Sequence, residues 1–161
     1  MKKICIGLAA LFISTAFAQL VQQASTEDLI EKLTPPKPAT RSLRNITVKP
    51  VTLDLSINFD FDSANLQSSS KPLLDNLANA MKSERLQSTA FKIEGHTDAK
   101  GKAEYNRELS ERRAIAVQKY LLTLGVGPER LQAEGKGYSE LLLPDSPLAS
   151  ENRRVRITVG Q

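Results

Sequence analysis

The chain has 161 residues, with 22 basic and 18 acidic side chains and a formal net charge of +4. This near-balance argues against nucleic acid or an anionic membrane surface as a partner, because proteins that bind them concentrate positive charge. The length fits one domain with some additional chain.

The first 18 residues are typical of a secretory signal peptide. They begin with Met1-Lys2-Lys3, continue with an uncharged apolar run over 4–17, and end with small residues around Phe17. We expect cleavage before Gln19; an uncleaved anchor is the alternative, although the run is shorter than the ~20 residues that span a bilayer. Cleavage removes the only cysteine, Cys5, and lowers the net charge to +2. We therefore predict a periplasmic protein without disulfides, either free or peripheral to the outer membrane.

Residues 19–51 are predicted to form a flexible tail or linker. The stretch from Thr26 to Leu33 has the length of about two helical turns, and the prolines after Thr34 end it. One interpretation is a tether of flexible chain. The alternative is a short helix that docks on another envelope protein.

Regular structure is predicted for residues 52–161. Apolar and polar residues alternate from Leu53 to Phe61, which is typical of a strand with one buried face. Further patterns predict a helix after Pro72, a strand over 90–94, a helix over 103–124 that ends at Gly125, and strands over 131–134 and 154–159. The resulting β-α-β-α-β-β order predicts a two-layer α/β sandwich with one mixed sheet covered by helices.

The long helix carries one arginine on its apolar side. At 3.6 residues per turn, Leu109, Arg113 and Val117 lie close to one line, with Asn106 one turn earlier. A buried arginine needs an acceptor, unless it extends to the helix edge and serves folding alone. In the functional alternative, Arg113 forms one side of a pocket and Asp98, in the loop before the helix, forms the other.

The segment Gly95-His96-Thr97-Asp98 holds the only histidine and raises the question of catalysis. One histidine without a cysteine does not supply the three or four ligands of a zinc site. No Gly-x-Ser-x-Gly motif is present, and Gly135-Lys136-Gly137 lacks the spacing of a phosphate loop. We therefore expect His96 to hydrogen-bond within its loop, and we predict no enzyme, cofactor or metal; a hydrolase that uses His96 and Asp98 is the remaining enzymatic alternative.

Several motifs occur in one spaced order across the predicted domain. They are Gly95-His96-Thr97-Asp98, Asn106, Leu109-Ser110, Arg113-Ala114, Gly135-x-Gly137 and Asn152-Arg153-Arg154-Val155. The pattern resembles the OmpA-like peptidoglycan-binding domain, which is shared by OmpA, Pal and MotB. This resemblance implies non-catalytic binding of the peptidoglycan stem peptide at its diaminopimelate residue, which would help to tether or organise the cell envelope.

The resemblance also implies which residues bind the ligand. Asp98 and Arg113 would hold the free amine and the free carboxylate of diaminopimelate. Lysine lacks that carboxylate and would leave Arg113 unpaired, which gives selectivity. Five further residues match positions of the same pocket: Asp62, Thr97, Asn106, Leu109 and Arg153. Thr97 would contribute through its backbone, and the match of Asp62 is the weakest of the five.

The chain departs from the family in its expected attachment to a membrane. After processing we expect none of the family's barrel, lipid or transmembrane helix. Attachment would then need an outer-membrane or other envelope protein that binds residues 19–51. The alternative function follows from this departure: an interaction protein that docks another envelope protein through the domain or through this tail.

Overall fold

The computed structural model describes residues 20–36 and 50–160. The predicted signal peptide and residues 37–49 of the predicted linker lie outside this part of the chain. The elements are α1 (Thr26–Leu33), β1 (Thr52–Leu55), α2 (Lys71–Lys82), β2 (Phe91–His96), α3 (Ala103–Thr123), β3 (Leu131–Gly137) and β4 (Val155–Val159), with 3-10 turns at Ser68–Ser70, Pro128–Arg130 and Ser150–Asn152. From residue 52 onward, this is the predicted order of strands and helices.

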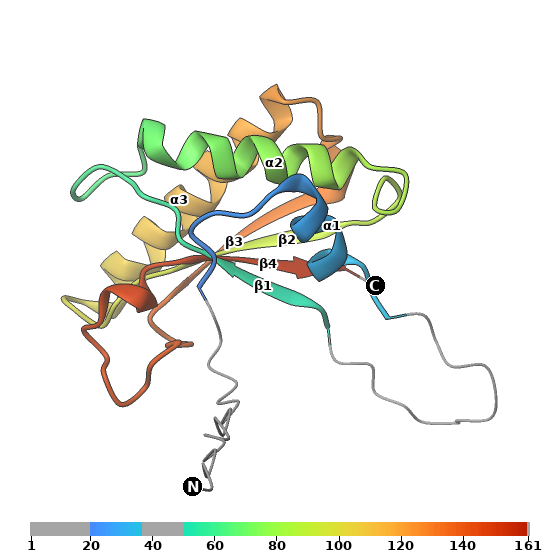
Figure 1. Ribbon diagram of the computed structural model, residues 1–161. Helices are drawn as coiled ribbons and strands as arrows, with labels where there is room; N and C mark the ends of the chain where they lie inside the picture. The colour runs from blue at the N-terminus through green and yellow to red at the C-terminus, as the bar shows by residue number, and fades with distance from the viewer. Residues whose placement is uncertain (1–19, 37–49, 161) are drawn as a thin grey trace, which may run out of the picture.

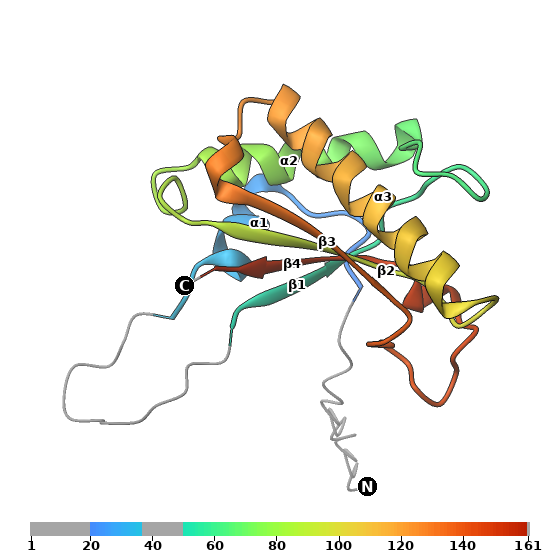
Figure 2. The ribbon, with the colours of Figure 1, turned by 180° about the vertical axis from the view of Figure 1, so that it is seen from behind.

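The four strands form one mixed sheet in the order β1-β4-β2-β3. The pair β2–β3 is parallel, and β4 is antiparallel to both β1 and β2. Helices α2 and α3 cover one face of the sheet (Figures 1 and 2). Leu74 and Leu77 of α2, Leu121 of α3 and Ile93 of β2 are fully buried between the layers. The predicted α/β sandwich is therefore confirmed.

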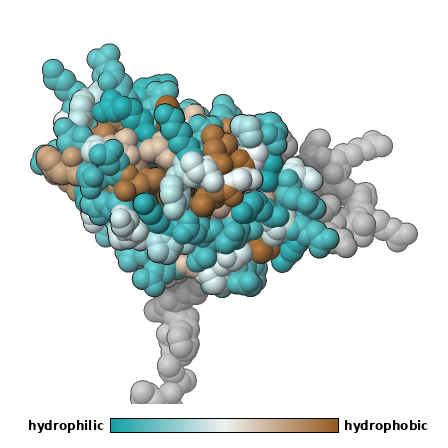
Figure 3. Space-filling model, turned by 90° about the horizontal axis from the view of Figure 1, so that it is seen from above, coloured by the Kyte–Doolittle hydropathy of each residue, from teal (hydrophilic) through white to brown (hydrophobic). Residues whose placement is uncertain are grey.

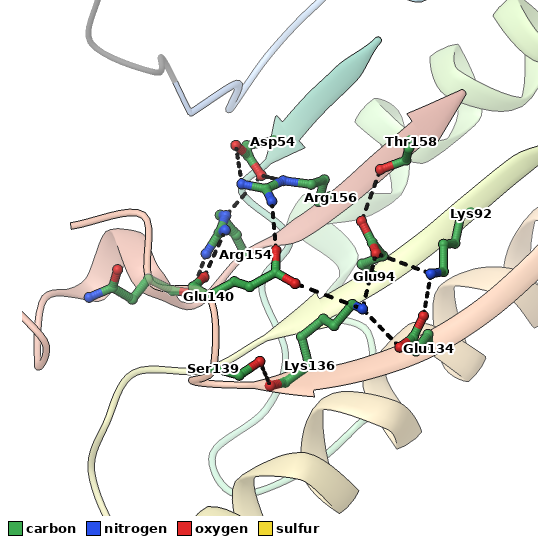
Figure 4. A network of polar contacts seen from close by, with 11 residues as sticks. Asp54, Lys92, Glu94, Glu134, Lys136, Ser139, Glu140, Arg154, Arg156 and Thr158 are labelled. Carbon is green, nitrogen blue, oxygen red and sulfur yellow. Dashed lines mark hydrogen bonds and ion pairs between the residues drawn. The ribbon is translucent and has the colours of Figure 1, made fainter. Parts of the chain in front are cut away.

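The other face of the sheet carries charged side chains in place of an apolar layer (Figure 4). Glu134 on β3 lies 2.8 Å from Lys136 and also pairs with Lys92 on β2. Hydrogen bonds from these two lysines lower the pKa of Glu134 to about 2. At the opposite side of this face, Asp54 on β1 accepts from Arg156 on β4 at 2.9 Å. Because opposite charges alternate across the strands, they neutralise one another.

The outer surface on the helix side is mainly hydrophilic, and its hydrophobic patches are separated from one another (Figure 3). Within residues 20–36 and 50–160, no helix is long and apolar enough to cross a membrane.

The first strand is shorter than the alternating pattern predicts. It ends at Leu55, which pairs with Val155, the first residue of β4. Beyond that point β4 offers no partner, and the chain leaves the sheet and forms a narrow hairpin in which Phe59 bridges to Leu66. Phe61 at its tip is fully exposed, so the expectation that it continues the buried face is wrong.

Part of the predicted linker belongs to the folded domain. Val21 donates to the carbonyl of Asp54 at 2.9 Å and accepts from Ser56 at 2.9 Å, so it extends the sheet beside β1. A capping box between Ser25 and Asp28 begins α1. The predicted helical segment therefore forms, but residues 21–33 are not a flexible tether.

The apolar side of helix α1 packs against the rest of the same chain. Leu29 and Leu33 are fully buried, and α1 contacts α2. Asn76 on α2 donates to the carbonyl of Ala24 at 2.9 Å and so fixes the start of α1. The two leucines are therefore not free to dock on another envelope protein.

We expect Leu29→Ala to destabilise the whole domain by about 2–4 kcal/mol, the usual cost of a large-to-small change in a core. Glu31→Ala, on the exposed side of the same helix, should change the free energy of unfolding by less than about 0.5 kcal/mol. Urea unfolding of both variants gives the comparison. Equal stability of the two would contradict the docking of α1 on the domain.

Candidate functional site

The strands that lead into the candidate site touch α3 backbone to backbone. A Cβ atom on Gly95 would overlap the carbonyl oxygen of Ser110, and one on Gly135 would lie 2.5 Å from the amide nitrogen of Glu111. The Ser110 hydroxyl also accepts a hydrogen bond from Gly137 at 2.8 Å. Only glycine allows this approach, which places the loop after β2 directly beside the first turns of α3.

Asp98 lies in that loop and is already engaged at both oxygens. Its Oδ1 accepts from the backbone N–H of Lys100 at 3.1 Å, and its Oδ2 pairs with Nη1 of Arg153 at 2.8 Å. The Arg153 side chain is about half exposed. The structure thus brings together two predicted site residues that are 55 positions apart.

Three other predicted residues support the loop or lie beneath it. The amide of Asn106 donates to the carbonyls of Lys100 at 2.8 Å and Lys102 at 3.2 Å. Thr97 donates its backbone N–H to Gly137 at 2.9 Å, and its side chain is buried, as is that of Leu109. Asn106 therefore fixes the loop to the start of α3.

Arg113 is half-buried, but it does not lie in an ion pair with Asp98. Its Nε donates to the carbonyl of Ser63 at 3.0 Å, and its guanidinium carbon lies 5.0 Å from the ring centroid of Phe59. It forms no ion pair with any residue that the structure describes. Burial is the main cause that lowers the pKa of Arg113; the positive charge of Arg153 also lowers it, whereas Asp62 and Asp98 oppose this change.

Asp62 contacts α3 and has an unusual backbone conformation. Its φ of 50° is in the left-handed region, at the tip of the 59–66 hairpin. The hydroxyl of Tyr105 donates to its carboxylate, and this bond raises the pKa of Tyr105. Asp62, Asp98 and Arg153 thus all contribute to the electrostatic surroundings of Arg113.

A hollow of about 390 Å³ adjoins these residues. Arg113 and Arg153 line it, together with Phe59 and with Leu20 and Gln22 from the N-terminal segment. The sequence patterns did not point to the Ser63 carbonyl, which binds Arg113, or to Gln22, which lines the same hollow, because the fold brings both near Arg113 from distant parts of the chain. Asp98 does not line this hollow but reaches it through Arg153.

His96 does not hydrogen-bond within its loop, contrary to the expectation from the sequence. The side chain is buried, and neither ring nitrogen has a hydrogen-bond partner among the described residues. Burial, followed by the positive charges of Arg154 and Arg156, lowers the pKa of His96 from 6.5 to about 3. The ring is therefore neutral at physiological pH and lies in the interior. Across residues 20–36 and 50–160, no group of three potential ligands could hold a metal ion.

The comparisons place this site in a known family. The OmpA family model matches residues 58–155, which include Asp62, Asp98, Arg113 and Arg153. The chain belongs to the OmpA family. Outer membrane protein A of Bordetella avium is 37% identical over 103 residues, 63% of this chain and 52% of that protein. The peptidoglycan-associated lipoprotein of Pseudomonas aeruginosa is 37% identical over 101 residues, 62% of this chain and 58% of that protein.

Solved structures of the OmpA family share the fold. The peptidoglycan-associated lipoprotein from Burkholderia pseudomallei has a TM-score of 0.57 at 33% identity, over 65% of this chain and 88% of that chain. The OmpA-like domain of FopA1 from Francisella tularensis has a TM-score of 0.59 at 27% identity, over 71% and 75%. The chain spans little more than half the length of the two curated OmpA-family relatives. Residues 20–36, with Gln22 and α1, lie outside the family match.

Proposed function

We propose that this chain binds peptidoglycan in the periplasm without catalysing a reaction, through the diaminopimelate residue of the stem peptide. Relatives named peptidoglycan-associated lipoprotein support the ligand. A relative named outer membrane protein A supports a place in the envelope. A buried, neutral His96, whose ring nitrogens have no hydrogen-bond partner among the described residues, supports binding over catalysis, because it orients no nucleophile among them.

The observation that carries the proposal is that half-buried Arg113 forms no ion pair among the described residues, although Asp62 and Asp98 lie near enough to influence its pKa. The distal carbon of diaminopimelate bears an ammonium and a carboxylate. Because Nε of Arg113 binds Ser63, its two Nη groups are left to receive the carboxylate as a pair of parallel hydrogen bonds. The ammonium then lies toward Asp98, with Asp62 adding negative charge from the hairpin.

The existing ion pair between Asp98 and Arg153 is compatible with this role. Half of the Arg153 side chain is exposed, and an exposed pair contributes only ~0–1 kcal/mol. A ligand ammonium can therefore share Asp98 with Arg153, or displace it, at little cost. Leu109 then supplies an apolar floor, Thr97 offers only its backbone carbonyl, and Asn106 preserves the loop geometry.

The test measures co-sedimentation of the purified protein with sacculi that contain diaminopimelate. We expect Asp98→Ala with Arg113→Ala to weaken binding by at least about 100-fold, because hydrogen bonds to charged groups contribute about 1.5–3 kcal/mol each. Arg112→Ala is the matched control, because this neighbouring arginine is exposed and, within the described part of the chain, pairs only with Glu108, at 3.8 Å. Sacculi with lysine in place of diaminopimelate should bind the unmodified protein weakly.

Circular dichroism and thermal melting establish that each variant is folded before its binding is compared. If the folded double variant sediments as the Arg112→Ala control does, the proposed site is wrong. Release of soluble fragments from sacculi would instead indicate a hydrolase.

A further inference from the structure

The hollow beside Arg113 is built partly by chain that the family match does not include. The match begins at residue 58, whereas Leu20 and Gln22 form one wall of the hollow. Arg113 and Arg153 also line this hollow. This part of the surface therefore includes chain outside the family match, and it adjoins the site proposed above.

The N-terminal wall is held in a defined position. Val21 makes two backbone hydrogen bonds to the β1 segment, and Ala24 accepts one from Asn76 of α2. Because side chains alternate along an extended segment, the buried Val21 directs its two neighbours, Leu20 and Gln22, to the other side. That side is the hollow, and Gln22 is fixed between two anchored residues.

The chemistry of the hollow suits an anion. Two guanidinium groups border it, and the positive charge of Arg153 helps to lower the pKa of Arg113. Among the described residues that line it, the only carboxylate is that of Glu151, which is exposed and accepts from the hydroxyl of Ser150. An anion between the arginines would relieve their repulsion, and the Gln22 amide can donate to it. A volume of about 390 Å³ is within the usual range for a ligand site.

We propose that this hollow is a second subsite, in which Arg153 and Gln22 bind the free α-carboxylate of the D-glutamate residue that precedes diaminopimelate. This inference rests on the proposed function. D-glutamate is linked to diaminopimelate through its side chain, which leaves the α-carboxylate free on the adjacent residue of the same peptide. Two neighbouring arginines thus meet carboxylates on two consecutive residues, with Arg113 assigned to diaminopimelate and Arg153 to D-glutamate.

The test compares two synthetic peptides, L-Ala-γ-D-Glu-diaminopimelate and its analogue in which the α-carboxylate is an amide. Both are titrated by calorimetry into the purified full chain, as the expressing cell processes it. We expect the amide to bind about 10-fold more weakly, the loss of one hydrogen bond to a charged group. Gln22→Glu should weaken binding of the peptide with the free α-carboxylate by about 10-fold or more, because the two negative charges repel each other. Its effect on binding of the amide peptide should be small.

Gln23→Glu is the matched control. It makes the same charge change one position along an exposed segment, and Gln23 does not line this hollow. Equal binding of the two peptides by the unmodified protein would overturn the subsite, and so would a Gln22→Glu effect that is the same for both peptides. If Asp98→Ala and Arg113→Ala still abolish binding in that case, the proposed function stands without the subsite. No binding of either peptide by the unmodified protein would overturn both.

Discussion

Gly95→Ala is expected to leave little folded protein. The new methyl group would overlap the carbonyl oxygen of Ser110 and lie 2.9 Å from its carbonyl carbon. These are backbone atoms in the middle of α3, so no side chain can move aside, and the helix must separate from the sheet. The cost should exceed about 4 kcal/mol, a large share of the 5–15 kcal/mol that stabilises an ordinary domain.

The control variant is Gly125→Ala, in which alanine replaces a glycine without a steric clash. Gly125 has a φ of 85°, just after α3, and a Cβ atom there would meet nothing within 4 Å. That variant should lose only about 1 kcal/mol, the cost of placing alanine in the left-handed region. Urea unfolding measures the difference between the two variants. Similar losses would show that α3 can shift from β2 at little cost.

The close packing around Gly95 also explains what the sequence could predict. Strand β2 and helix α3 have strong periodicity over long stretches, and their patterns locate them to within a few residues. The end of β1 was not predictable, because apolar residues continue to alternate through Ile57 and Phe59 after the strand has lost its partner at Val155. Pairing with a strand a hundred positions away decides that boundary, and local propensity does not.

The same distinction applies to the N-terminal segment. Thr26 to Leu33 has the length and the capping residues of a short helix, but an isolated helix of this length is marginal in water. What stabilises α1 is the burial of Leu29 and Leu33 against α2, which lies beyond residue 70. The composition of this segment resembles that of a linker, and the tertiary contacts make it part of the domain.

For the candidate site, the helical pattern pointed to Arg113 and the loop sequence to Asp98, and both stay predictions. Their surroundings were not predictable. The carbonyl of Ser63 is a backbone group fifty positions from Arg113, and any residue type could supply it. Asp98 was expected to face Arg113, whereas in the structure it pairs with Arg153. A sequence pattern gives the charged residues of a candidate site, but not which of them form ion pairs with one another.

His96 is expected to make the stability of the domain sensitive to mild acid. Its pKa is about 3 in the folded chain and 6.5 as its ordinary value, so the unfolded chain binds the additional proton between these values. Stability is therefore fully present above about pH 6.5 and is lost progressively as the pH falls toward about 3. The loss from this residue is at most about 5 kcal/mol, at about 1.4 kcal/mol for each unit of pKa difference.

His96→Leu should remove this dependence while it preserves the buried volume, because the neutral ring has no hydrogen bond to lose among the described residues. Urea unfolding between about pH 5 and 7 isolates the effect, since carboxylates such as Asp54 and Glu134 have lowered pKa values and titrate mainly at lower pH. The unmodified protein should lose roughly 2 kcal/mol over this interval, and His96→Leu should lose little. Parallel curves for the two proteins would mean that folding does not lower the pKa of His96, which would contradict a ring that stays neutral in the folded chain at pH 5.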